Sequence, residues 1–215
     1  MGCKALFAAN IEIFARKATP QTAQAQGIAR HDELICASLE TPQKRRPVNP
    51  SATSSSPRIC RADYANRIHS SAIVLLLDAY ARDSAGGGEP LSEFAKTHLV
   101  KELAARPQAF SVLAFDDAQP IGLVTCIEGF STFACKPLVN VHDVAVLASH
   151  RGQRVAEQML ALAEVIARER GACKMTLEVL QGNSSAIRLY ERMGFAGYQL
   201  DPAMGQAQFF QKWLE

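Results

Sequence analysis

An ordered series of elements in the last third of the chain constrains its fold more than any other feature. Apolar residues over 138–146 predict a strand, which runs into a glycine-containing turn. The turn opens a helix over 153–170, in which apolar residues recur at the spacing of one helical face. A second strand over 175–180 leads into a short helix over 184–193, which a glycine ends. This order predicts a sheet with helices packed against it.

The folded domain is predicted to begin after a linker. Residues 41–58 contain four prolines, six serine or threonine residues and Val48 as the only large apolar side chain. Such a segment cannot bury enough surface to offset the entropy lost on ordering. We therefore predict a low-complexity, poorly ordered extension and linker over residues 1–57 and a single folded domain over residues 58–215.

Further elements complete the predicted sheet. The patterns indicate strands over 58–61, 110–115, 121–129, 198–200 and 208–213, and helices over 65–82 and 92–105. Strands grouped before and between helices indicate an α/β (α+β) fold, with a mixed, mostly antiparallel central sheet and helices on both faces.

Charge and cysteine content exclude several classes of partner. Residues 58–215 hold 16 basic and 17 acidic side chains, so they lack the basic face that nucleic acid requires. No apolar run reaches the roughly 18 residues of a membrane span. The six cysteines form no CxxC pair and lack histidines at zinc-site spacing, which predicts reduced thiols, no metal and a cytoplasmic location. We expect a monomer or homodimer with neither nucleic acid nor membrane as a partner.

The turn over 151–156 has the chemistry of an anion site. The first backbone N–H groups of a helix have no partner within it, and the helix dipole favours anions there. Gly152 leaves room for a pyrophosphate, Ala156 is small and Arg151 adds positive charge. Arg154 has two opposite effects on phosphate binding. Its backbone N–H can still donate to the anion, but its side chain must move aside or itself pair with the phosphate. An ordinary loop entering an ordinary helix is the alternative.

Polar residues near the two predicted strands are candidates for proton transfer. Tyr190 can protonate a departing thiolate, because a phenol titrates at about 10 and a thiol at about 8.5. Asn183 can cap its helix, contact a ligand, or do both. His142 and Asp143 interrupt an apolar strand, and either of them, or Glu128, can take a proton from an attacking amine, unless they form a structural network. Successive strand residues face opposite sides, so at most one of the pair lines a given cleft unless a bulge intervenes.

Together these motifs resemble the GCN5-related N-acetyltransferase (GNAT) superfamily over about residues 58–215. Residues 151–156 resemble its phosphate-loop pattern Gln/Arg-x-x-Gly-x-Gly/Ala, with Arg154 where glycine is expected. Residues 142–146 resemble the strand whose splayed backbone pairs with the pantetheine arm of acetyl-CoA. The downstream motif of the family is matched by Asn183-x-x-Ala186-x-x-Leu189-Tyr190-x-x-x-Gly194-Phe195.

The resemblance implies an acetyl-CoA-dependent N-acetyltransferase without a metal, in which an amine attacks the thioester directly. The predicted catalytic residues are Tyr190, which protonates the departing coenzyme A, and Asp143 or water through His142, which accepts the proton of the amine. Backbone N–H groups over 144–146 polarise the thioester carbonyl. The predicted residues that bind acetyl-CoA, the co-substrate, are Val144, Ala145, Val146, Arg151, Gly152, Gln153, Arg154, Val155, Ala156, Asn183, Ala186 and Tyr190.

A small-molecule amine is the expected acceptor. A protein N-terminus or lysine, a non-catalytic module that senses acyl-CoA, and a partner-binding protein without any cofactor are the alternatives. We expect the acceptor site to be bounded by residues 86–91 and 130–135, whose glycines and aromatic side chains suit a flexible lid over a small pocket.

Overall fold

The computed structural model describes residues 56–198, 203, 205 and 207–214. The extension predicted over residues 1–57 therefore lies outside the described residues, except for positions 56 and 57. In the described part of the chain, no helix is both long enough and apolar enough to cross a membrane.

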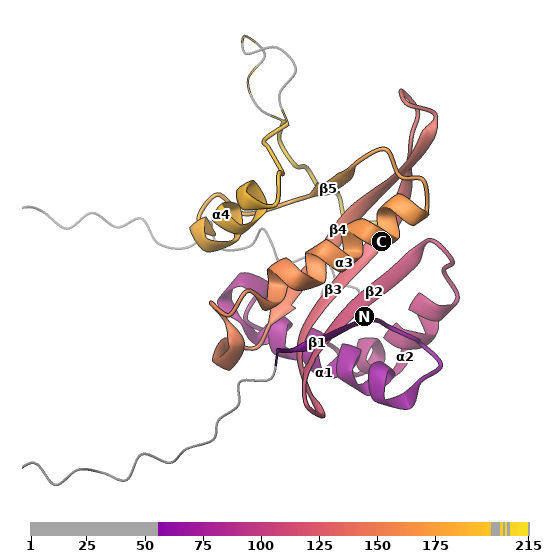
Figure 1. The fold of residues 1–215 in the computed structure, drawn as a ribbon, viewed down its shortest axis with the longest axis vertical. Coiled ribbons are helices and arrows are strands. Elements are labelled where there is room, and N and C mark those ends of the chain that lie inside the picture. Colours follow the sequence, from indigo (N-terminus) through magenta and orange to yellow (C-terminus); the bar gives the residue numbers. More distant parts are fainter. Residues whose placement is uncertain (1–55, 199–202, 204, 206, 215) are drawn as a thin grey trace, which may run out of the picture. The chain divides into compact units, whose positions relative to one another are not determined.

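A five-stranded sheet forms the centre of the domain (Figure 1). Its strands lie in the order of the sequence, and neighbours are antiparallel except for the last pair, which is parallel. The strands are β1 (Arg58–Arg61), β2 (Ala109–Asp116), β3 (Gln119–Ser131), β4 (Lys136–Val146) and β5 (Met175–Leu177). This arrangement confirms the predicted mixed, mostly antiparallel sheet. The parallel pair requires a crossover, which α3 (Val155–Glu169) supplies.

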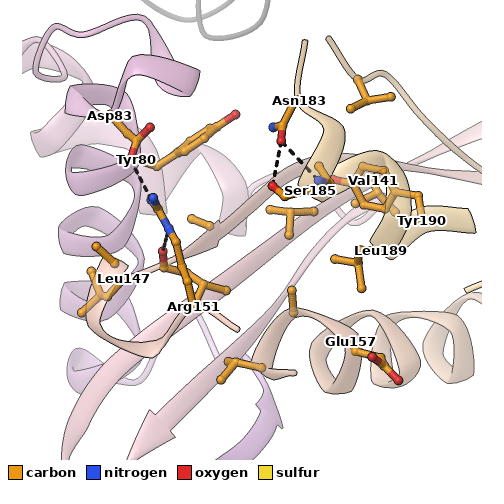
Figure 2. A pocket seen from close by; sticks show the side chains of 18 of the residues that line it. Tyr80, Asp83, Val141, Leu147, Arg151, Glu157, Asn183, Ser185, Leu189 and Tyr190 are labelled. Atoms are coloured by element: carbon orange, nitrogen blue, oxygen red, sulfur yellow. Dashed lines mark hydrogen bonds and ion pairs between the residues drawn. The ribbon is translucent and has the colours of Figure 1, made fainter. Parts of the chain in front are cut away.

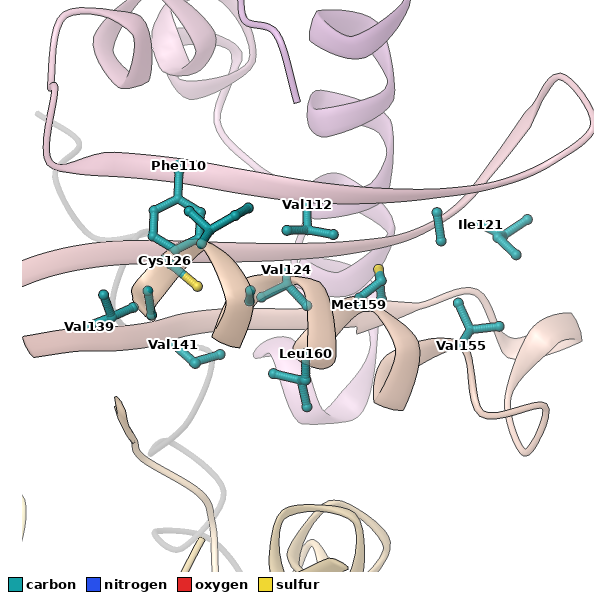
Figure 3. Close-up of a cluster of buried hydrophobic side chains, with 14 residues drawn as sticks. Phe110, Val112, Ile121, Val124, Cys126, Val139, Val141, Val155, Met159 and Leu160 are labelled. Atoms are coloured by element: carbon teal, nitrogen blue, oxygen red, sulfur yellow. The ribbon is translucent and has the colours of Figure 1, made fainter. Parts of the chain in front are cut away.

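Helices cover both faces of the sheet, as predicted. α1 (Arg67–Arg82) and α2 (Glu93–Ala104) pack on one face, where they share a buried cluster with Leu113 of β2. α3 packs on the opposite face, over a cluster that contains the neighbouring residue Val112 (Figure 3). The side chains of successive β2 residues thus point alternately into the two buried clusters. α4 (Ser184–Arg192) follows β5.

Side-chain caps explain where three of these helices begin. The side chains of Asn66, Ser92 and Asn183 accept hydrogen bonds from backbone N–H groups in the first turns of α1, α2 and α4. Each cap satisfies a donor that has no partner within its helix. The predicted cap at Ser92 is therefore confirmed.

The end of α4 follows the prediction made from its glycine. Gly194 has a φ of 86°, which favours glycine, and its N–H donates to the Glu191 carbonyl (3.0 Å). The N–H of Phe195 donates to the Tyr190 carbonyl (2.9 Å), and the two aromatic rings meet edge to face at 5.9 Å. This hydrogen-bond pair and its apolar contact form a Schellman cap.

β4 contains a bulge at His142. Thr125 of β3 pairs with Asp143 and the next residue, Cys126, pairs with Val141, so His142 has no residue opposite it. The parallel pairing of β4 with β5 also ends at Val141. The two strands therefore separate beyond the bulge.

Three predicted strands differ from the prediction in the described residues. The strand predicted over 175–180 ends at Leu177, because β4 and β5 separate there and residues 178–180 have no ladder partner. The closing strand predicted over 208–213 is wrong, since these residues are exposed and pair with no strand of the described chain. A strand-like sequence does not form a strand without a neighbour to complete its hydrogen bonds. Of the strand predicted over 198–200, Tyr198 has no strand conformation and the other two residues lie outside the described part.

Candidate active site

A cleft of about 1230 Å³ opens where β4 and β5 separate (Figure 2). The C-terminal end of α1 forms one wall, and α4 with residues 178–183 forms another. Residues of the second half of β4, the loop that follows it and the first turn of α3 complete the lining. The cleft thus extends from the predicted phosphate turn to Tyr190.

Two residues in left-handed conformation shape the turn that enters α3. Gly152 has a φ of 77°, and a Cβ at this position would meet open space. Arg154 has a φ of 59° and is the N-cap of α3, so the position where the family pattern has glycine does adopt a backbone that favours glycine. Arg154 makes no side-chain cap, which leaves the N–H groups of Val155 and Ala156 available to an anion.

Arg151 connects this turn to the end of α1. Its guanidinium pairs with Asp83 (2.7 Å), and its Nε donates to the Val146 carbonyl (3.1 Å) (Figure 2). Asp83 is the C-cap of α1. The ion pair neutralises part of the charge that the sequence provides for a phosphate, and it holds the end of β4 beside the turn.

Most of the predicted cofactor-binding residues lie together on the walls of the cleft. They are Val144, Ala145, Val146, Arg151, Gly152, Arg154, Val155, Ala156, Asn183, Ala186 and Tyr190. Gln153 is not on these walls, because its side-chain amide turns back and donates to the Ser149 carbonyl (3.1 Å). The strand, the turn and the short helix identified from the sequence therefore meet at one place.

α4 presents Tyr190 and Asn183 to the cleft (Figure 2). Burial raises the pKa of the Tyr190 hydroxyl above its ordinary value, so the phenol remains protonated at neutral pH. The Oδ1 of Asn183 accepts from the Ala186 N–H (3.2 Å) and from the Ser185 hydroxyl (3.1 Å). Asn183 therefore caps its helix through oxygen, while its amide nitrogen can still contact a ligand.

The bulge lets His142 and Asp143 both line one cavity, while only His142 also lines the cleft. His142 lines the cleft and also a second cavity of about 310 Å³ between α1, α2 and the sheet. Asp143 lines the second cavity and not the cleft, and it accepts a hydrogen bond from Thr125. Burial raises the pKa of Asp143, while His142 and the bond from Thr125 oppose that rise.

Tyr80 is a residue of the cleft that the sequence patterns do not identify. Its side chain extends from α1 into the space opposite α4 (Figure 2). Burial, together with the nearby groups Asp143, Tyr190 and Asp83, raises the pKa of Tyr80 to about 12. The hydroxyl is therefore protonated at neutral pH. The apolar spacing of α1 predicts a helix but does not show which of its polar side chains faces another element.

The remaining candidates lie elsewhere. Glu128 pairs with Arg170 (3.0 Å) near the end of α3 and lines neither the cleft nor the second cavity. The segments 86–91 and 130–135, which were expected to bound an acceptor site, contribute no residue to either cavity. Leu91 packs instead in the buried cluster that α1 and α2 share with the sheet. The walls of the second cavity come instead from α1, α2, β3 and β4.

Parts of this chain are similar in sequence to known proteins. The acetyltransferase (GNAT) family profile matches residues 75–195. Streptothricin acetyltransferase of Streptomyces lavendulae is 41% identical over 68 residues, which cover 32% of this chain and 36% of that protein. N-alpha-acetyltransferase 30 of Schizosaccharomyces pombe (strain 972 / ATCC 24843) is 28% identical over 111 residues, which cover 52% of this chain and 71% of that protein.

A solved structure described as a probable acetyltransferase has the same fold. It matches with a TM-score of 0.62 and 24% identity, over 74% of this chain and 99% of that one. The match to streptothricin acetyltransferase spans only about a third of that protein's length. The family profile, in contrast, extends from within α1 to the end of α4 and so includes every element that lines the cleft. Because it also covers more than half of the sequence, the chain belongs to the acetyltransferase (GNAT) family.

Proposed function

We propose that this chain transfers an acetyl group from acetyl-CoA to the amine of a small molecule, which attacks the thioester directly. The observation that carries the proposal is the meeting of two cavities at His142, beside the bulge in β4. A thioester in the larger cleft and an amine in the smaller cavity would come together at this residue. Direct transfer requires such a meeting point, because no covalent intermediate carries the acyl group between sites.

The cleft has the features that acetyl-CoA requires. The uncapped first turn of α3 offers N–H groups for its diphosphate, with Gly152 leaving room for their approach. The edge of β4 beyond Val141 has no neighbouring strand in the described structure, so its N–H and C=O groups can pair with the pantetheine arm. A volume of about 1230 Å³ exceeds the about 300–1,000 Å³ of a typical drug-sized site, as a long substrate demands.

Residues around the point where the cleft and the second cavity meet can serve each proton transfer. As the amine nitrogen bonds to the carbonyl carbon, Asp143, directly or through water beside His142, accepts the proton that the amine releases. Backbone N–H groups over 144–146 stabilise the charge that develops on the carbonyl oxygen. As the carbon–sulfur bond breaks, Tyr190 donates to the departing sulfur, and the coenzyme leaves as a thiol.

The size of the second cavity supports a small acceptor. It measures about 310 Å³, and the match to streptothricin acetyltransferase also favours a small molecule. The match to N-alpha-acetyltransferase 30 favours a protein N-terminus as the second candidate. The cysteines of the described residues are free thiols, which supports the cytoplasmic location that we also propose.

Release of free thiol from acetyl-CoA in the presence of an amine panel tests the proposal. We expect release that depends on the amine, and greater release with small amines than with a peptide bearing a free N-terminus. Acetyl-CoA at 100 times its dissociation constant should add about 2.7 kcal/mol to stability, which a thermal melt detects. Tight binding by calorimetry without thiol release from any amine or peptide would refute catalysis and identify an acyl-CoA sensor.

A further inference from the structure

The second cavity, between α1, α2 and the sheet, has mostly apolar walls. Ile73 and Leu77 of α1, Leu99 and Leu103 of α2, and Ile127 of β3 contribute to them. The volume of about 310 Å³ is at the lower end of the about 300–1,000 Å³ found for small-molecule sites. These side chains stabilise a compact apolar body, and the polar part of the lining is too small to satisfy a heavily hydroxylated one.

Charged groups of this cavity leave one position for a cation. Of its two carboxylates in the described structure, Glu102 is exposed and already paired with Arg106 (2.7 Å). The other, Asp143, lies on the sheet beside the bulge, where Thr125 donates to it. An amine that reaches Asp143 also reaches His142, where the cavity meets the cleft. A second cation on the same molecule would meet only apolar side chains or Glu102, whose charge Arg106 already neutralises, which is unfavourable.

An aromatic pair from α2 borders the same cavity. The rings of Phe94 and His98 stack with centroids 4.2 Å apart, and both residues line the cavity. Phe94 is nevertheless 72% exposed, so this pair lies where the cavity opens to solvent. An exposed aromatic face at an opening provides a surface for the apolar end of a ligand.

We propose that the acceptor is a small amine with one cationic nitrogen and an apolar or aromatic body, bound in the second cavity with its nitrogen at Asp143 and its body against α1 and α2. This inference rests on the proposed acetyltransferase function and narrows its substrate class. Amines that carry several cations are disfavoured, because the single carboxylate available to them is already used by the reacting nitrogen.

Two amines of equal length test the inference with the full chain. Hexylamine and 1,5-diaminopentane differ only at the far end, which is a methyl group in one and a second cation in the other. With acetyl-CoA and thiol release as the readout, kcat/KM for hexylamine should be at least about 10-fold higher, the smallest effect expected for one lost apolar contact. Equal or greater kcat/KM for the diamine would overturn the inference.

A charge placed at the opening provides the second measurement. Phe94→Asp gives the far amino group a partner, so the preference for hexylamine should fall by about 10-fold or reverse. Ile68→Asp is the matched control, because Ile68 is 67% exposed on α1 and lines neither cavity; the preference should not change. An unchanged preference in Phe94→Asp would place the acceptor elsewhere. If no amine at all releases thiol, the acetyltransferase function itself fails, whereas turnover with the wrong preference refutes only the substrate class.

Discussion

Removing the hydroxyl of Tyr190 is the most direct perturbation of the proposed chemistry. Tyr190→Phe keeps the ring that packs edge to face on Phe195 at 5.9 Å, and it keeps the backbone hydrogen bond that closes α4. The variant should therefore fold normally, with a melting temperature within the about 2–4 °C that 1 kcal/mol produces in a chain of this size. Any loss of turnover then reports on the hydroxyl.

The environment of Tyr190 sets the size of the expected effect. An ordinary phenol and an ordinary thiol differ by about 1.5 pKa units, so complete proton transfer to a thiolate is unfavourable by about 2 kcal/mol. Burial raises the pKa of Tyr190 further, and the same burial raises the pKa of a thiol that departs into the cleft. The phenol therefore acts chiefly as a hydrogen-bond donor with partial proton transfer. We expect kcat to fall by about 100-fold, the lower end of the range for such groups.

Separate measurements of binding and turnover decide the outcome. The dissociation constant of acetyl-CoA, measured by calorimetry, should not change in Tyr190→Phe, while kcat from thiol release falls. Tyr198→Phe is the matched control, because Tyr198 is exposed and lines neither cavity. A kcat for Tyr190→Phe within about 2-fold of the wild type would remove this hydroxyl from the mechanism.

Three further changes have expected outcomes. Burial raises the pKa of Asp143 above its ordinary value, so the folded state is favoured by a protonated Asp143 at low pH and loses that advantage as the pH rises through the folded-state pKa. Asp143→Asn should therefore lower kcat, while its melting temperature relative to wild type rises as the pH increases. The opposite trend in thermal melts across pH would contradict this. Arg154→Gly should raise the free energy of unfolding by up to about 1.5 kcal/mol, because the left-handed backbone costs arginine about 1–2 kcal/mol and the entropy of glycine offsets about 0.5–1 kcal/mol of it. A denaturant titration that shows a loss would be inconsistent with this. Gly86→Ala would bring a Cβ into the Tyr80 carbonyl, so the free energy of unfolding should fall by about 1–3 kcal/mol and kcat should fall with it. Gly197→Ala, whose Cβ would meet open space, should change neither.

Local signals in the sequence were sufficient for the elements that carry the site. Asn183 predicts the start of α4 through its side-chain oxygen, and Gly194 with Phe195 predicts its end through a left-handed residue and an apolar contact. These signals depend on residues within one or two turns, so tertiary packing does not override them. The same holds for Gly152, whose conformation follows from the turn it occupies.

Long-range contacts could not be read from the sequence in the same way. Asp83 and Arg151 pair across 68 positions, and neither residue has a motif that points to the other. Tyr80 enters the cleft only because α1 packs across the sheet near α4. The closing strand expected over 208–213 shows the reverse error, since a strand pattern has no effect without a partner.

The bulge explains how one strand serves both cavities. Val141 packs in the cluster beneath α3, whereas Ala145 packs in the cluster beneath α1 and α2. Regular alternation would put both on the same face, because an even number of positions separates them. The extra residue at His142 therefore reverses the alternation and turns Asp143 towards α1 and α2, opposite Thr125. Without it, Asp143 would lie beneath α3, where a carboxylate is costly, and β4 would continue beside β5 with no cleft between them. Two polar residues in an apolar strand thus follow from one backbone irregularity, which opens the larger cleft and aims a carboxylate into the smaller cavity.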